Sequence, residues 1–231
     1  DVKKALDEAD GDVEKATEII RVKGLKGIAK REGRSASAGL VAARVVDAAD
    51  GQVGVMVEIN AETDFVAKNE KFLDFADQVL AAAVASGAET AEALAEADVD
   101  GTTVKDLTDS MQAVIGEKIV VRRVARLAAP RVDTYLHRTN PDLPAQVAVL
   151  VGTDEAAAEV AHDIAMHIAA YSPLYLARED VPEETVAKER AIAEETTRAE
   201  GKPEKAIPKI VEGRLSGFFK ENVLVDQAFA K

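Results

Sequence analysis

Apolar and polar residues alternate in two neighbouring stretches, residues 40–46 and 53–59, as in two β-strands joined by a short turn. Asp50 and Gly51 lie between them and favour a tight turn. In the stretch that follows, the apolar residues recur every three or four positions, which is typical of a helix. We therefore predict a β-hairpin followed by a helix that ends near Gly87.

The second half of the chain shows a similar order of patterns. Residues 120–127 and 145–151 are interpreted as paired strands, and residues 156–170 have helical spacing. Two strand-strand-helix units in one chain indicate an α+β fold with two similar subdomains. We place these subdomains at residues 28–119 and 120–182.

The start of the chain predicts a small helical piece at residues 1–27. Asp12 is a suitable N-cap for its second helix, and Gly24 is a suitable C-terminal stop. A basic cluster overlaps its end and contains Arg21, Lys23, Lys26, Lys30, Arg31 and Arg34. We favour a solvated linker for this cluster. A patch that meets an acidic protein surface is the next interpretation, and nucleic-acid binding is the third, because no aromatic residue is interleaved to stack on bases.

An antiparallel helical hairpin is predicted at residues 183–221, because a Gly-Lys-Pro break at residues 201–203 separates two helical stretches. The first arm is very polar and is expected to project, whereas large apolar residues anchor the second arm. Pro208 is expected to kink the second arm or to mark its start. Residues 222–231 are interpreted as a return segment to the core. Whether the hairpin pairs with a second copy of the chain or with a partner is left open.

Composition narrows the classes of function. The net charge of −13 argues against nucleic acid or an anionic membrane surface as the main ligand, since both require a positive field. The absence of cysteine excludes disulfides, thiolate metal sites and cysteine nucleophiles. No apolar run approaches the roughly 20 residues of a membrane span, and no signal peptide opens the chain, so we expect a cytoplasmic protein.

Candidate catalytic residues are few. The histidines are His137, His162 and His167, and the last two lie five positions apart, so they do not form the i, i+4 pair of a helical metal site. No phosphate-binding glycine loop and no nucleophile turn of the G-x-S-x-G type occurs. The residues alone therefore indicate an α+β protein that acts by binding, with no metal or cofactor. A small hydrolase that uses His167 with a nearby carboxylate is an alternative from another class.

Phe65 is the most informative single residue of the sequence. It lies where the second predicted strand gives way to a helix, in a chain with only 4% aromatic residues. A large ring at such a polar junction either folds back on the core or faces a partner. From the residues alone, packing on the core is the favoured interpretation.

The residues around Phe65 also carry a resemblance to a known family. Residues 60–69 closely resemble the signature of bacterial translation elongation factor Ts. Four further stretches are similar to family motifs and occur in the family's order, at residues 23–31, 115–117, 164–170 and 211–215. The family has a further helix before residue 1, in a domain similar to a ubiquitin-associated fold, and continues past residue 231 into a C-terminal module.

This resemblance implies a guanine-nucleotide exchange factor for elongation factor Tu, acting in protein biosynthesis and making or breaking no covalent bond. By analogy with the family, Phe65 wedges beside the partner's nucleotide site and Asp64 helps to displace the elements that hold Mg²⁺. The resemblance reverses the earlier expectation, so Phe65 is now expected to be exposed. The remaining partner contacts that it implies are Thr63, Val66, Ile115, Gly116 and His167. For Ile115, packing on the core is an equally good interpretation.

Overall fold

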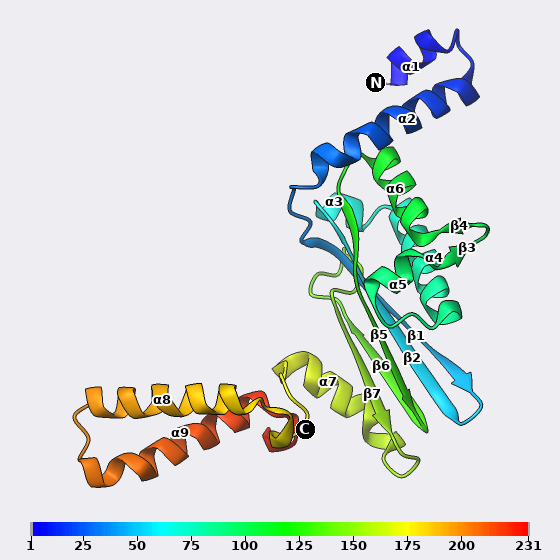
Figure 1. Cartoon of the computed structure of the whole chain (residues 1–231). Coiled ribbons are helices and arrows are strands. Elements are labelled where there is room, and N and C mark those ends of the chain that lie inside the picture. The colour runs from blue at the N-terminus through cyan, green and yellow to red at the C-terminus, as the bar shows by residue number, and fades with distance from the viewer. Residues whose placement is uncertain (1, 231) are drawn as a thin grey trace. The chain divides into compact units, whose positions relative to one another are not determined.

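A computed structural model describes residues 2–230 and shows the mixed α+β fold that the hydrophobic pattern predicts (Figure 1). The chain separates into two units, Asp1–Ala165 and Met166–Lys231. The sheets and the helices packed on them belong to the first unit, and the second consists mainly of a helical hairpin. This division does not test the predicted domain boundaries after residues 27, 119, 182 and 221, which stay predictions.

A three-stranded antiparallel sheet organises the first unit. Its strands, in spatial order, are β1 (Ala38–Ala48), β2 (Gly51–Ala61) and β5 (Ile119–Ala129). Ala48 pairs with Gly51, which leaves a two-residue turn and confirms the predicted hairpin. Because β2 lies between two partners, its backbone groups are paired on both sides and it forms the centre of the sheet.

The predicted pairing of residues 120–127 with residues 145–151 is wrong. The first stretch is β5, which pairs with β2, and the second stretch belongs to β7 (Val147–Thr153), which pairs with β6 (Arg131–His137). The period-two pattern of β6 was missed because Arg, Asp and His occupy three of its positions. β6 and β7 followed by a helix do repeat the order of β1, β2 and the helix after them.

Helices cover one face of the three-stranded sheet (Figure 1). The core joins fully buried valines and Ile59 of β2 to Phe72, Phe75 and Val79 of α4. Gly87 has a φ of 67° and ends α4, as predicted from the sequence. The elements of this layer are α3 (Asp64–Ala67), α4 (Glu70–Ser86), α5 (Ala91–Ala95), β3 (Asp98–Val99), β4 (Thr102–Thr103) and α6 (Val104–Ile115). The short helix α3 lies at the end of β2 that is remote from the β1–β2 turn (Figure 1).

The N-terminal piece contains α1 (Val2–Glu8) and α2 (Val13–Arg31). Asp12 caps α2, as predicted, by accepting hydrogen bonds from two backbone N–H groups of its first turn. The predicted stop at Gly24 is wrong, because the helix continues to Arg31 and the glycine instead lies against α6. The favoured interpretation of the basic cluster as a linker is therefore also wrong, since most of this cluster lies on α2.

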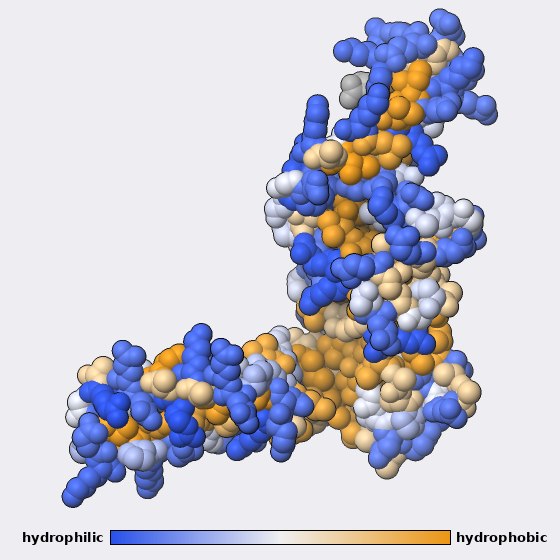
Figure 2. Space-filling view, viewed as in Figure 1, coloured by the Kyte–Doolittle hydropathy of each residue, from blue (hydrophilic) through white to orange (hydrophobic). Residues whose placement is uncertain are grey.

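The second unit contains the predicted helical hairpin. Its arms are α8 (Glu183–Ala199) and α9 (Ile207–Asn222), and they run antiparallel in Figure 1. The apolar seam between them consists of Ala193, Ile207, Val211 and Leu215, with Phe219 packed against it. On the face that Figure 2 shows, hydrophilic residues cover most of this hairpin, with apolar residues visible among them. Pro208 occupies the first turn of α9, so it marks the start of the arm.

The remaining elements are α7 (Ala161–Tyr171) and four short 3₁₀ turns among residues 2–230. A 3₁₀ turn at Ala158–Val160 precedes α7, which begins in the first unit and ends in the second. Further 3₁₀ turns lie at Arg178–Asp180, Glu204–Ala206 and Leu224–Asp226. No helix among residues 2–230 has the length and apolar character that crossing a membrane requires.

The close approach of α2 to α6 predicts opposite effects of two Gly→Ala substitutions. A Cβ at Gly24 would lie 2.6 Å from the carbonyl oxygen of Ala113, whereas a Cβ at Gly213 of α9 would have no neighbour within 4 Å. Overpacking costs roughly 1–3 kcal/mol, and the helix-propensity gain is at most about 1 kcal/mol. Gly24→Ala should therefore lower stability, and Gly213→Ala should raise it, in urea unfolding followed by circular dichroism. A Gly24→Ala variant at least as stable as the wild type contradicts the close packing.

Candidate functional site

The turn between β2 and α4 exposes two side chains and buries the next two. Asp64 and Phe65 face solvent, and Phe65 is 78% exposed, whereas Val66 is 8% exposed and Ala67 is fully buried. The expectation that Phe65 is exposed is confirmed, and the alternative of packing on the core is wrong. Val66 is part of the hydrophobic core, so the structure does not support it as a direct partner contact.

The exposed pair combines an aromatic ring with a free carboxylate. The Nζ atom of Lys68 lies 5.2 Å from the centroid of the Phe65 ring, within the range of a cation–π contact. The Asp64 carboxylate has no hydrogen-bond or ion-pair partner among residues 2–230. An apolar surface and a negative charge are thus adjacent on one four-residue helix.

Two carboxylates hold the backbone just before α3. The Thr63 N–H donates to Glu117 Oε2 at 3.0 Å, and the Thr63 hydroxyl donates to Glu117 Oε1 at 2.8 Å. In the opposite direction, Glu62 Oε1 accepts a hydrogen bond from the Lys118 N–H at 2.6 Å. We call these four residues, Glu62, Thr63, Glu117 and Lys118, the carboxylate clamp.

The clamp is also attached to the segment that follows α2. Arg34 donates to the Glu62 carboxylate at 3.2 Å, and the Lys118 side chain donates to the Arg34 carbonyl at 3.1 Å and to the Glu32 carbonyl. The Lys118 N–H, together with the Arg34 guanidinium, holds the pKa of Glu62 below its ordinary value. The ionised form of Glu62 therefore stabilises the fold.

The corner between α6 and β5 brings Gly116 beside this turn. Gly116 has a φ of 83°, ends α6 with an N–H bond to the Gln112 carbonyl, and is exposed. Ile115 is partly buried against the main core, so packing accounts for much of its side chain. Glu117 belongs to the motif at residues 115–117, but the sequence alone indicates no role for it. Its partner Thr63 is 54 positions away, and no local pattern indicates such a contact.

His167 belongs to the second unit and is only 3% exposed. Gln227 donates its amide N–H to the Glu221 carbonyl, so its oxygen accepts the Nε2–H of His167 at 2.9 Å. The ring stacks on Tyr171 with a centroid distance of 4.6 Å, and Nδ1 has no hydrogen-bond partner within residues 2–230. The structure therefore supports neither a direct partner contact nor the hydrolase alternative, since the bonded partner is an amide rather than a carboxylate.

Several side chains of the basic cluster are engaged within the chain. Lys23 pairs with Glu8 at 2.7 Å, and Arg21 donates to Ser110 at 3.1 Å. Arg31 is buried and donates to backbone carbonyls of α2 and α6. Within the cluster, Lys23 and Arg34 pair with carboxylates, whereas Lys26 and Lys30 are exposed. The net charge of −13 therefore remains the observation that disfavours nucleic acid.

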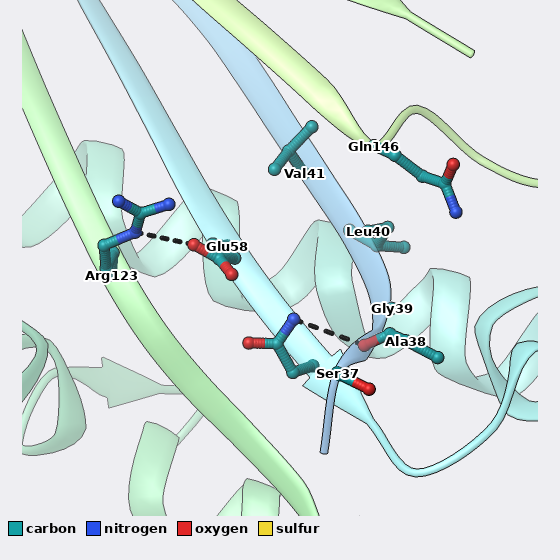
Figure 3. Close-up of a pocket in the computed structure, with 9 residues that line it drawn as sticks. Ser37, Ala38, Gly39, Leu40, Val41, Glu58, Arg123 and Gln146 are labelled. Atoms are coloured by element: carbon teal, nitrogen blue, oxygen red, sulfur yellow. Dashed lines mark hydrogen bonds and ion pairs between the residues drawn. The ribbon is translucent and has the colours of Figure 1, made fainter. Parts of the chain in front are cut away.

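A cavity of about 230 Å³ lies over the strands β1, β2 and β5, and Figure 3 draws the residues that line it. Among its lining residues, Arg123 and Glu58 of neighbouring strands form an ion pair of 2.6 Å, and the Asn60 amide donates to the Ala38 carbonyl at 3.2 Å. None of the seven predicted site residues lines this cavity. Among residues 2–230 there is also no group of three or more side chains suited to hold a metal ion. The candidate site is therefore the exposed turn rather than a pocket.

Comparisons with known proteins agree on one family. The family model described as elongation factor TS matches residues 62–231, a range that contains the turn and the α6–β5 corner. The chain is 69% identical to elongation factor Ts of Beutenbergia cavernae, 64% to that of Micrococcus luteus and 62% to that of Renibacterium salmoninarum. Each match covers all of this chain and 83% of the relative. The chain belongs to the elongation factor Ts family.

The match to the family model begins at Glu62, the first residue of the carboxylate clamp. The matched region also contains His167, which the structure places in the interior of the second unit. Family membership thus applies to the exposed turn and to the buried histidine alike, and only the structure separates a surface residue from an interior one.

The lowered pKa of Glu62 predicts how stability depends on pH. Because the pKa in the folded state lies below the ordinary value of 4.5, the contribution of Glu62 is fully present above that value and is lost as pH falls through the folded pKa. The difference in unfolding free energy between wild type and Glu62→Gln should be constant near pH 7 and shrink below about pH 4.5. Urea unfolding at a series of pH values measures it. A difference that stays constant down to pH 3.5 or grows on acidification rules out this role.

Proposed function

We propose that this chain promotes GDP release from elongation factor Tu by inserting Phe65 and Asp64 beside the partner's nucleotide and Mg²⁺ site. A role in translation elongation follows from membership of the elongation factor Ts family, whose function is nucleotide exchange on elongation factor Tu. The insertion of these two side chains is our proposal. The observation that carries it is the 78% exposure of a phenylalanine on a turn whose next two residues are buried.

The energy of burying one aromatic ring is sufficient for such a role. An aromatic anchor at the centre of an interface contributes roughly 2–4 kcal/mol. Since about 1.4 kcal/mol corresponds to a tenfold change in affinity, this is roughly a 30-fold to 700-fold effect. Binding through a ring that is already exposed in the free chain also has a low free-energy cost, because no core contact has to be broken.

Exchange of this kind is a coupling between two ligands of one partner. If the chain weakens the binding of GDP, GDP must weaken the binding of the chain by the same factor. The chain therefore has to bind a conformation of the partner that GDP and Mg²⁺ disfavour. No covalent bond is made or broken in this scheme, so the chain needs no catalytic group and no cofactor of its own.

The remaining residues of the turn divide into contacts and supports. Asp64, which has no partner among the described residues, is free to compete for hydrogen-bond donors of the loops that hold Mg²⁺. Gly116 and the exposed part of Ile115 form a second contact on the neighbouring corner. Thr63 and Val66 act as supports that hold the turn from within. A cytoplasmic location, where bacterial translation takes place, is part of this proposal.

Substitution of Phe65 by Ala tests the proposal. The rate at which the chain accelerates release of a fluorescent GDP analogue from elongation factor Tu should fall at least about tenfold in stopped-flow measurements. The stability of the free chain should change by less than about 0.5 kcal/mol, because the ring is exposed.

Leu136→Ala provides a matched control, since Leu136 is an exposed apolar side chain of the same unit outside the turn. This variant should accelerate release as the wild type does. Unchanged release by Phe65→Ala, combined with a large loss of thermal stability, would place the ring in the core and refute the proposal.

A further inference from the structure

The helix that carries Phe65 cannot maintain its own conformation. It has four residues, and a single helical turn is unstable in isolation because nucleation fixes several dihedral angles for one hydrogen bond. Its N-cap residue, Thr63, has the extended backbone of a cap, but its side chain makes no capping hydrogen bond to the helix. The Thr63 hydroxyl donates to Glu117 instead. The orientation of the helix therefore depends on groups outside it.

Glu117 supplies the support on the N-terminal side. Both of its carboxylate oxygens accept hydrogen bonds from Thr63, one from the backbone N–H and one from the hydroxyl. Hydrogen bonds to an ionised carboxylate are stronger than those between neutral groups. On the C-terminal side, burial of Val66 and Ala67 holds the helix against the core. Asp64 and Phe65 lie between these two supports, so their backbone is fixed from both sides.

The pairing of β2 with β5 explains why Glu117 reaches this position. Ala61 pairs with Ile119 at the end of the antiparallel ladder. Continuing that register by one and two residues places Lys118 opposite Glu62 and Glu117 opposite Thr63, which are the pairs that the clamp joins. The clamp thus extends the ladder past the ends of both strands, using side-chain oxygens as acceptors.

We infer that Glu117 is a positioning residue for nucleotide exchange, which fixes the direction of the Phe65 ring through Thr63. The inference rests on the proposed function of Phe65. The statement that Glu117 orders the turn concerns the free chain alone, so it can fail or hold independently of the proposed function. Rigid presentation of a contact residue increases affinity because less freedom is lost on binding. Loss of Glu117 should therefore reduce exchange through the ring.

Fluorescence tests whether Glu117 orders the turn in the free chain. The chain contains no tryptophan, so one introduced at position 65 is the only indole. In a Phe65→Trp background the single indole reports motion at this position. Glu117→Ala should lower its anisotropy, and Glu117→Gln should lower it less, because the amide keeps one acceptor oxygen. Glu155→Ala, which removes an exposed glutamate paired with Arg131 elsewhere in the unit, should leave it unchanged. Equal anisotropy in the Glu117→Ala and Glu155→Ala proteins overturns the inference.

A double-mutant cycle on GDP release from elongation factor Tu tests the role of Glu117 in exchange. Glu117→Ala, which removes both hydrogen bonds to Thr63, should slow stimulated release by about tenfold, within the effect expected for loss of the ring itself. In the Phe65→Ala background the same substitution should have a much smaller effect, since only the contact of Asp64 is left for Glu117 to position. Additive effects would show an independent role for Glu117 and overturn the inference.

Two further outcomes separate this inference from the proposed function. If the Phe65→Ala chain stimulates GDP release as well as the wild type does, the proposed function fails. The anisotropy measurement still decides whether Glu117 orders the turn. If the Phe65→Ala chain stimulates GDP release slowly but the Glu117→Ala chain stimulates it as the wild type does, only the inference about Glu117 fails. Thermal melting checks that each variant folds. Should Glu117→Ala unfold, Thr63→Val removes one of the two bonds and should show a smaller effect of the same sign.

Discussion

The presentation of Phe65 depends on a helix of four residues that is too short to be stable alone. Its conformation comes from two kinds of interaction acting at its two ends. Hydrogen bonds to Glu117 fix the residue before it, and burial of Val66 and Ala67 fixes the residues after the ring. An exposed aromatic side chain held in this way combines accessibility with a defined direction, which is what a contact residue in a specific interface requires.

The rest of the first unit provides these supports. The central strand β2 leads into the turn. Its neighbour β5 begins beside the end of β2, so the α6–β5 corner lies next to the turn. The helix α4, packed on the sheet through Phe72 and Phe75, provides the core under Val66. Arg34 and Lys118 connect the corner to the segment after α2. The position of one ring thus depends on contacts between residues more than fifty positions apart.

Much of this arrangement follows from local sequence pattern. The β1–β2 hairpin, the end of α4 at Gly87 and the helical hairpin were predicted from periodicity and glycine or proline positions. The exposure of Phe65 was predicted only from the resemblance to a family, because the polar junction by itself favours burial. Family resemblance in turn did not distinguish Phe65 from His167, which is interior.

What the sequence did not reveal concerns contacts between distant segments. Strand β5 was assigned to β7 because apolar strand patterns do not specify a partner, and this error hid the clamp. With the correct partner, the register alone places Glu117 opposite Thr63. The continuation of α2 past Gly24 was missed for a similar reason, since only the approach of Ala113 explains a glycine there.

We propose that this chain and GDP weaken each other's binding to elongation factor Tu through Phe65. The most direct measurement is a calorimetric titration of the chain into nucleotide-free partner and into partner saturated with GDP, each with and without Mg²⁺. We expect much weaker binding of the chain to the GDP-loaded partner, weaker still with Mg²⁺, and a much smaller difference for a chain that lacks the Phe65 ring. Equal affinity of the wild-type chain for the free and GDP-loaded partner would contradict it.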